Sequence, residues 1–313
     1  MLYVFIDGQA GTTGIEITDR LRGRTDLELI TLSDAERKNP ERRAEALTSA
    51  DVAILCLPDD AAKEAVVLAE GRARLIDAST AHRTHPEWVY GLAELSEGQR
   101  SQLRNARFVS NPGCYPQGFI LMIRPLIEAG LLSADTPLTC HALSGYSGGG
   151  RQMIEKYRAA EPASQEGLGA RPYSMGLAHK HVPEMHLYSR CASRPVFAPI
   201  VCNYYKGMTV HVPLFRSQLG CSAEDVQKRL AERYADEAFI QVFPFGAADS
   251  LDGGYLDPTT CNDTNRLEIM VFGNNDQILL TARYDNLGKG AAGAAVQNLN
   301  LMLGVEESTG LCP

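Results

Sequence analysis

One cysteine stands in a setting where a thiol could act as a nucleophile. In the stretch "VSNPGCYPQGF", Cys114 follows a short apolar run and precedes a long one, so we expect it between a strand and a helix. The N-terminus of a helix favours the thiolate over the thiol. From position alone, Cys114 is either a nucleophile or one more buried thiol among eight cysteines.

Two histidines in "AHKHVPEM" could donate or accept the protons that a reaction at such a thiolate requires. We predict His181 as the general acid/base, with Glu184 orienting it or binding substrate. Two alternatives stay open. His179 and His181 could bind zinc together with Cys114 and a distant further ligand, or they could be surface histidines on a loop. We prefer the interpretation without a metal.

Three glycines recur three residues apart in "DGQAGTTG", directly after the first apolar run. This pattern predicts a dinucleotide-binding loop, in which glycine allows a tight turn and a helix N-terminus receives the pyrophosphate. A strand-to-helix turn without a ligand has the same pattern. The predicted cofactor-binding residues of the loop are Gly8, Ala10, Gly11, Thr12, Thr13 and Gly14.

The end of the second apolar run bears on the choice of cofactor. An acidic residue there would bond the ribose 2'-hydroxyl of NAD, whereas a small or basic residue admits a 2'-phosphate. Ser33 ends this run, and Arg37 and Lys38 follow one turn later. These residues favour NADP(H), with Ser33 and Arg37 as contacts, although a solvated turn fits the same sequence.

A second glycine-rich stretch, "SGYSGGGR", follows an apolar run and precedes a helical segment. Hydroxyls and backbone N–H groups in such a stretch could hold a phosphate or carboxylate, although a flexible turn is the alternative. Arg83, in "STAHR", is a further candidate anion ligand. The candidates in the glycine-rich stretch are Ser144, Gly145, Ser147 and Arg151.

These residues need elements that position them, and the first third of the chain supplies an alternating pattern. Strands at 2–6, 27–32, 52–57, 74–79 and 107–110 alternate with helices near 13–22, 42–49 and 59–69. Such alternation predicts a parallel sheet covered by helices, hence an α/β Rossmann domain over residues 1–113.

The chain changes character after Cys114. A helix near 116–129 precedes longer β-rich runs, two of which flank a predicted hairpin at 274–276. We therefore predict an α+β domain over 114–285 with a mixed, mostly antiparallel sheet. A final helix at 289–303 carries small residues in its first turns. The irregular stretch 161–178 is long enough to suggest a functional loop.

Composition limits the classes of partner. The chain has 313 residues, of which 44% are hydrophobic, and this suits two well-cored domains. A net charge of −8 argues against nucleic acid or an anionic membrane as the main partner. The cysteines form no C-x-x-C pair. Neither a signal peptide nor a run of about 20 apolar residues is visible, so we expect the protein to be located in the cytoplasm.

Taken together, these motifs resemble the N-acetyl-gamma-glutamyl-phosphate reductases of arginine biosynthesis, in the superfamily of aspartate-semialdehyde dehydrogenase, and the length is that of their shorter subtype. The resemblance covers nearly the whole chain. The stretches that carry it are the glycine loop, "IDASTAHR", "WVYGLAEL", "SNPGCYPQG", "SGYSGGGR", "HKHVPEM" and "YDNLGKGAAGAAVQNLNLM".

The resemblance implies an NADPH-dependent reduction of an acyl phosphate, with Cys114 as nucleophile and His181 as acid/base. It implies that Asn286 approaches the nicotinamide, that Asn111 is near the substrate, and that the last segment, 286–313, completes the first domain. It also implies a homodimer or homotetramer. Alternatives are a reductase of an aspartyl or aminoadipyl phosphate, a Cys-His acyltransferase or hydrolase, and a non-catalytic NADP sensor.

Overall fold

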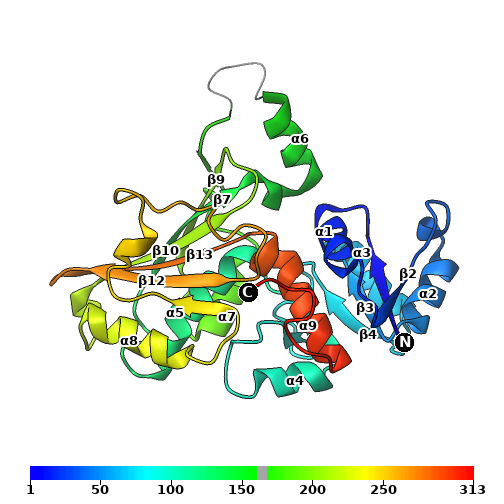
Figure 1. Cartoon of the computed structure of the whole chain (residues 1–313), viewed down its shortest axis with the longest axis horizontal. Helices are drawn as coiled ribbons and strands as arrows, with labels where there is room; N and C mark the ends of the chain where they lie inside the picture. Colours follow the sequence, from blue (N-terminus) through cyan, green and yellow to red (C-terminus); the bar gives the residue numbers. More distant parts are fainter. Residues whose placement is uncertain (161–167) are drawn as a thin grey trace. The chain divides into compact units, whose positions relative to one another are not determined.

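The computed structural model describes residues 1–160 and 168–313, which form two compact units. The first unit comprises Met1–Gly113 and Ala291–Cys312, and the second comprises Cys114–Gly290 with Pro313. Figure 1 shows both units in colours that follow the sequence. The irregular stretch 161–178 lies partly outside the described residues.

The first unit is built on a six-stranded sheet. Every neighbouring pair of strands in it is parallel, as the sequence predicts, and the order is β2-β1-β3-β4-β6-β5. The short edge strand β5 was not predicted, because two residues show no periodicity. The strands are β1 (Leu2–Asp7), β2 (Leu27–Ile30), β3 (Val52–Leu55), β4 (Arg74–Asp77), β5 (Val89–Tyr90) and β6 (Phe108–Ser110).

Helices pack on this sheet in two groups. The helix α9 contacts α1, α4 and the strands β3 and β4, while α2 contacts α3 and β1. α2 begins sharply, because the Asn39 side chain accepts hydrogen bonds from two N–H groups of its first turn and Pro40 occupies the first position. The helices are α1 (Thr12–Leu21), α2 (Pro40–Ser49), α3 (Asp59–Leu68), α4 (Gln99–Asn105) and α9 (Gly293–Leu303).

The second unit is built on a seven-stranded mixed sheet in the order β11-β12-β13-β10-β7-β9-β8. The pairs β7–β9 and β11–β12 are parallel and the other four are antiparallel. The predicted hairpin is confirmed between β12 and β13, where the Asn274 side chain accepts from the N–H groups of Asp276 and Gln277. The strands are β7 (Thr139–Gly145), β8 (Arg171–Pro172), β9 (Val196–Cys202), β10 (Met208–Phe215), β11 (Ile240–Val242), β12 (Leu267–Gly273) and β13 (Gln277–Tyr284).

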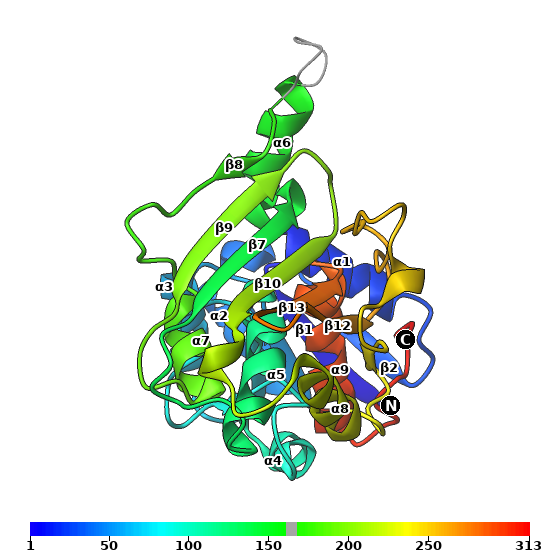
Figure 2. The same ribbon diagram turned by 90° about the vertical axis from the view of Figure 1, so that its left-hand side faces the viewer.

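The helix α5 (Cys114–Glu128) is the central helix of the second unit. It contacts α7 (Val182–Ser189), α8 (Ala223–Arg233) and the strands β10, β12 and β13. It begins two residues earlier than predicted, so that Cys114 is its first residue. A fourth helix, α6 (Gly150–Ala160), follows the second glycine-rich stretch. Figure 2 shows β8, β9, β7 and β10 side by side.

The predicted helix at 289–303 differs at its start. A π-helical turn at Gly288–Ala292 precedes α9, and residues 286–290 belong to the second unit rather than to the first. The reason is a set of local hydrogen bonds: the Gln117 side chain donates to the Lys289 carbonyl, and Asn286 bonds two loops of the second unit.

None of the helices within residues 1–160 and 168–313 is long and apolar enough to cross a membrane.

Candidate active site

Cys114 is the half-buried first residue of α5. The Tyr284 hydroxyl donates a hydrogen bond of 2.7 Å to its carbonyl oxygen. Gly290, in the π-helical turn, approaches it so closely that a Cβ at that position would lie 3.1 Å from the Cys114 Cβ. The predicted position at the start of a helix is thus confirmed, and glycine at position 290 permits the close approach of this turn to the cysteine.

Burial makes most other thiols unreactive. Desolvation and the carboxylates of Asp77 and Asp7 raise the pKa of the Cys56 thiol to about 12, and burial raises the pKa of Cys261 to about 12. Such thiols are protonated at neutral pH and are weak nucleophiles. Burial also raises the pKa of Cys140, Cys191, Cys202 and Cys221.

His181 lies in the same part of the second unit as Cys114. It directly precedes α7 and is only 6% exposed. Its ring centre is 5.7 Å from that of Tyr115, the residue after the cysteine, and 4.7 Å from that of His179. The interpretation of His181 as an exposed surface residue is therefore wrong. Glu184 is buried in the first turn of α7.

Two tyrosines that the sequence reasoning missed join this cluster. The Tyr173 hydroxyl donates to the Tyr115 hydroxyl at 3.2 Å and lies 3.3 Å from His179 Nε2. Burial raises the pKa of Tyr173 to about 12 and that of Tyr115 well above its ordinary value, so both phenols stay neutral. The only sequence feature that could have indicated either tyrosine is the position of Tyr115 directly after the cysteine. No group of three metal-ligating side chains occurs among the described residues.

The structure brings part of the second glycine-rich stretch together with Asn286. Ser144 and Ser147 are both buried, and Asn286 Nδ2 donates to Ser147 Oγ at 2.9 Å. Asn286 Oδ1 accepts from the N–H of Gly207 at 2.9 Å. A Cβ on Gly148 would lie 3.3 Å from Asn286 Nδ2 and 3.7 Å from Ser144 Oγ. Asn286 therefore joins this stretch to the loop before β10.

Two other residues of the stretch have different settings. Gly145 lies so close to the loop after β9 that a Cβ there would be 2.4 Å from the Tyr205 carbonyl oxygen. Arg151 is exposed on α6, where its Nε is 2.7 Å from a carboxylate oxygen of Glu155. The structure thus does not group Arg151 with the buried serines.

In the first unit, the glycine loop makes a tight turn between β1 and α1. Gly8 has φ of +92°, and a Cβ there would lie 2.3 Å from the Cys56 carbonyl oxygen. A Cβ on Gly14 would lie 2.5 Å from the Gly8 carbonyl oxygen. α1 starts at Thr12, directly after Gly11, so the unpaired N–H groups of its first turn follow the loop. Ala10 and Thr13 lie within the same short segment.

The predicted cofactor contacts after β2 lie on an exposed turn. The Ser33 hydroxyl and N–H donate to the Glu36 carboxylate at 2.8 and 3.0 Å, and Arg37 pairs with Asp34 at 3.3 Å. The sequence reasoning missed Glu36, whose pKa is lowered by the hydrogen bonds from Ser33 and by Arg42.

Arg83 and Asn111 lie in the first unit and are buried. Arg83 Nε donates to the Asn111 carbonyl oxygen at 3.0 Å. The Asn111 side chain donates to the Ala291 carbonyl and accepts from Asn298, so it ties the end of β6 to the last helix. These contacts show a structural role, and the substrate roles of both residues stay predictions.

Comparisons with known proteins agree with this architecture. Residues 3–106 match the family model described as "Semialdehyde dehydrogenase, NAD binding domain", and residues 114–286 match "Semialdehyde dehydrogenase, dimerisation domain". Among solved structures, aspartate semialdehyde dehydrogenases of Vibrio cholerae and Francisella tularensis superpose with TM-scores of 0.73 and 0.74. They cover 97% of this chain and 98% and 100% of their own, at 16% and 15% identity, and so show the shared fold.

Curated relatives are much more similar in sequence. "N-acetyl-gamma-glutamyl-phosphate reductase 2" of Nostoc sp. is 49% identical over 98% of both chains. "N-acetyl-gamma-glutamyl-phosphate reductase" of Burkholderia lata is 50% identical over 97% of both chains. At this identity over nearly the full length of both partners, the chain belongs to the N-acetyl-gamma-glutamyl-phosphate reductase family.

Proposed function

We propose that the protein catalyses the NADPH-dependent reduction of N-acetyl-L-glutamyl 5-phosphate to N-acetyl-L-glutamate 5-semialdehyde and phosphate, in arginine biosynthesis. The observation that carries the proposal is the full-length similarity to reductases named for this substrate. Such a biosynthetic role fits a cytoplasmic enzyme.

The first step is proposed for Cys114. Its thiolate attacks the acyl carbon, a carbon–sulfur bond forms, and the bond to the phosphate oxygen breaks, so that inorganic phosphate leaves. Cysteine suits this step because it is a strong nucleophile whose thioester still accepts hydride. Its position at the start of α5 supports the role, since helix N-terminal N–H groups stabilise the thiolate.

The second step reduces the thioester. NADPH supplies the hydride. His181 is proposed to give a proton to the carbonyl oxygen as negative charge develops there, and to take it back when the thiohemiacetal collapses and the carbon–sulfur bond breaks. The burial of His181 beside Tyr115 supports this role, because packing holds the imidazole in a fixed position near the residue that follows Cys114.

The residues of the first unit fit a dinucleotide. Glycine at positions 8 and 14 lets the loop backbone pack closely against the backbone of Cys56 and of Gly8, where a Cβ would clash. The start of α1 then presents N–H groups to a pyrophosphate. We propose that Ser33 and Arg37 contact the 2'-phosphate. The proposed contacts in the glycine loop are Gly8, Ala10, Gly11, Thr12, Thr13 and Gly14.

The remaining predicted residues are candidates for holding the substrate's phosphate or carboxylate. The buried hydroxyls of Ser144 and Ser147 support such a role, because buried donors bind an anion more strongly than exposed ones. Asn286 is proposed to position these serines and to approach the nicotinamide. The other candidates are Arg83, Asn111, Gly145, Arg151 and Glu184.

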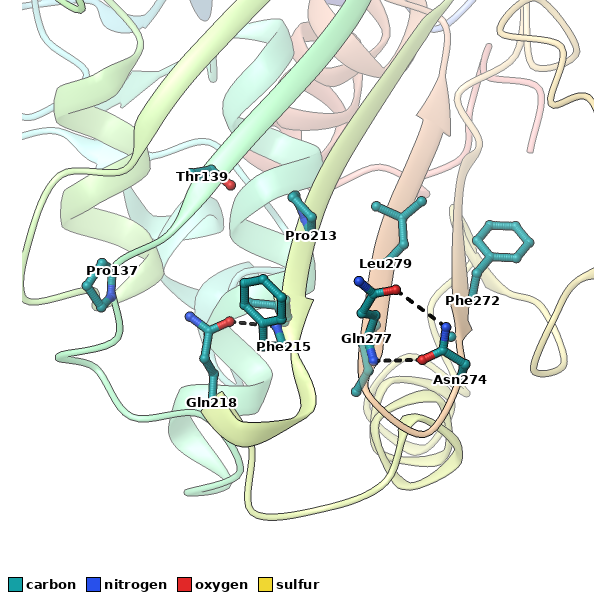
Figure 3. Close-up of a pocket in the computed structure, with 12 residues that line it drawn as sticks. Pro137, Thr139, Pro213, Phe215, Gln218, Phe272, Asn274, Gln277 and Leu279 are labelled. Carbon is teal, nitrogen blue, oxygen red and sulfur yellow. Dashed lines mark hydrogen bonds between the residues drawn. The ribbon is translucent and has the colours of Figure 1, made fainter.

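We further propose that two chains pair through the part of the seven-stranded sheet where apolar side chains are exposed. The matched family model describes this region as a dimerisation domain. Val196 and Phe215 are exposed on these strands, at 48% and 63%. Phe215 lines a pocket of about 650 Å³ together with Pro137, Pro213 and Leu279. Figure 3 shows these side chains. A second copy of the chain would cover these apolar groups.

The reaction is tested in the oxidative direction. The protein is expected to reduce NADP with N-acetylglutamate semialdehyde and phosphate, and to do so much less well with aspartate semialdehyde. Cys114→Ser should abolish turnover, and His181→Asn should lower kcat by about 100-fold or more. A Cys114→Ser enzyme with wild-type phosphate-dependent turnover would sink the proposal, and a preference for aspartate semialdehyde would reassign the substrate.

A further inference from the structure

A buried phenol on β13 contacts the first turn of the helix that starts with Cys114. Tyr284, the last residue of β13, is fully buried. Its hydroxyl donates to the Cys114 carbonyl oxygen at 2.7 Å and accepts from the N–H of Gly118 at 3.2 Å. The same hydroxyl is 3.4 Å from the Tyr115 carbonyl oxygen.

The two groups that Tyr284 bonds are those that a helix pairs with each other. In an α-helix the N–H of residue i donates to the carbonyl of residue i−4, so the N–H of Gly118 and the carbonyl of Cys114 define the first turn of α5. One hydroxyl therefore contacts both ends of this turn. This arrangement fixes the backbone from which the Cys114 side chain projects.

Neighbouring strands and the helix α5 hold the phenol of Tyr284 in place. Tyr284 is paired in the sheet with Met208 on one side and Leu267 on the other. A Cβ on Gly118 would lie 3.0 Å from both the hydroxyl oxygen and a ring carbon of Tyr284. Glycine at position 118 thus permits the close approach of the phenol to the helix.

The hydroxyl also keeps its proton. Burial and the neighbouring Cys114 raise the pKa of Tyr284 well above its ordinary value. The phenol is therefore neutral at neutral pH, and it can donate to the Cys114 carbonyl.

We propose that Tyr284 is a positioning residue for Cys114: its hydroxyl holds the first turn of α5 and thereby aims the thiol at the acyl carbon. This inference rests on the proposed role of Cys114. It assigns Tyr284 no proton transfer and no contact with the substrate.

The test compares conservative substitutions of two tyrosines whose hydroxyls contact the same helix, α5. Tyr284→Phe removes the hydroxyl at the start of α5. Tyr234→Phe is the matched control, because the buried Tyr234 hydroxyl also donates to a carbonyl of α5, that of Leu121, at 2.7 Å. Both variants are assayed for kcat and KM, and for the rate at which iodoacetamide alkylates Cys114 as a function of pH, read by peptide mass.

We expect Tyr284→Phe to lower kcat about 10-fold with KM changed by less than about twofold, since small misplacements of a reacting group are costly. The pH profile of alkylation should shift to higher pH. Tyr234→Phe should leave both readouts as in the wild type. Wild-type kcat and alkylation in Tyr284→Phe, or equal losses in the two variants, would overturn the inference.

If Tyr284→Phe does not fold, Gly118→Ala is the second variant, because its added methyl pushes the phenol away from the helix. Gly118→Ala should lower kcat and shift the alkylation profile in the same direction. Wild-type values in this variant would overturn the inference.

Cys114→Ser separates the positioning role of Tyr284 from the proposed function. A fully active Cys114→Ser enzyme refutes the proposed function, whereas an inactive one beside an unperturbed Tyr284→Phe refutes only the positioning role.

Discussion

At the scale of single residues, the sequence led to Cys114 and His181 because their neighbours are distinctive. A turn precedes the cysteine, a helix follows it, and the histidine stands before a second helix. Tyr284 could not be found in this way. It lies 170 residues from Cys114 along the chain, and an apolar strand that ends in tyrosine is common.

Gly290 provides a prediction at this scale. Gly290→Ala would place a methyl 3.1 Å from the Cys114 Cβ and 3.0 Å from the Asp285 carbonyl oxygen. We expect kcat to fall about 10-fold or more, because the crowded cysteine loses its attacking geometry. Steady-state kinetics measure the effect. Gly220→Ala is the control, since nothing lies within 4 Å of a Cβ there; equal kcat in both variants would contradict the role of Gly290.

At the scale of elements, the glycine loop and the start of α1 are proposed to bind the pyrophosphate of the cofactor together. Gly14→Ala would bring a methyl within 2.5 Å of the Gly8 carbonyl oxygen, which belongs to backbone and cannot move aside easily. We expect NADPH affinity to fall about 10-fold or more, as measured by fluorescence titration. The rate of Cys114 alkylation reports on the second unit and should not change in this variant. Wild-type NADPH affinity would argue against the loop as the cofactor site.

The paired strands β7 and β10 provide a prediction about pH. His211 on β10 lies opposite His141 on β7, and its ring nitrogens are 3.0 Å from the hydroxyls of Thr281 and Thr209. Burial and His141 lower the pKa of His211 to about 4. The unfolded chain takes up this proton near pH 6.5, so the free energy of unfolding should fall as pH drops from about 6.5 to about 4.

His211→Gln removes this titration and keeps hydrogen-bonding groups. The loss of stability between pH 7 and pH 4.5 should therefore be smaller in the variant than in the wild type. Urea unfolding at the two pH values measures the difference, and carboxylates contribute equally to both proteins. An equal loss in both would show that His211 does not resist protonation in the folded state.

The pattern of apolar residues along the sequence predicts some of the secondary-structure elements and misses others. The five parallel strands that were predicted are short, mostly apolar runs separated by helical segments, and the hairpin at 274–276 has its turn residues, so both were recognised. The two-residue strand β5 and the π-helical turn at Gly288–Ala292 were missed. Both depend on contacts with distant residues, such as the bond from Gln117 to the Lys289 carbonyl.

At the scale of the whole molecule, the exposed apolar side chains of the seven-stranded sheet lead to a prediction about assembly. Phe215→Glu would place a charge on an apolar surface that a second copy is proposed to cover. We expect the mass by sedimentation equilibrium to shift from dimer toward monomer. Tyr255→Glu is the control, since Tyr255 is 81% exposed on a loop outside the strands. Equal masses for both variants would contradict this interface.

The proposed mechanism depends on a thioester at Cys114, and a burst experiment tests it most directly. Enzyme is mixed with N-acetylglutamate semialdehyde and NADP without phosphate, and NADPH is followed in a rapid-mixing instrument. A thioester mechanism predicts a burst of about one NADPH per active site, with the N-acetylglutamyl group on the peptide that contains Cys114, followed by near-arrest until phosphate is added. No burst without phosphate, or the acyl group on another residue, would contradict it.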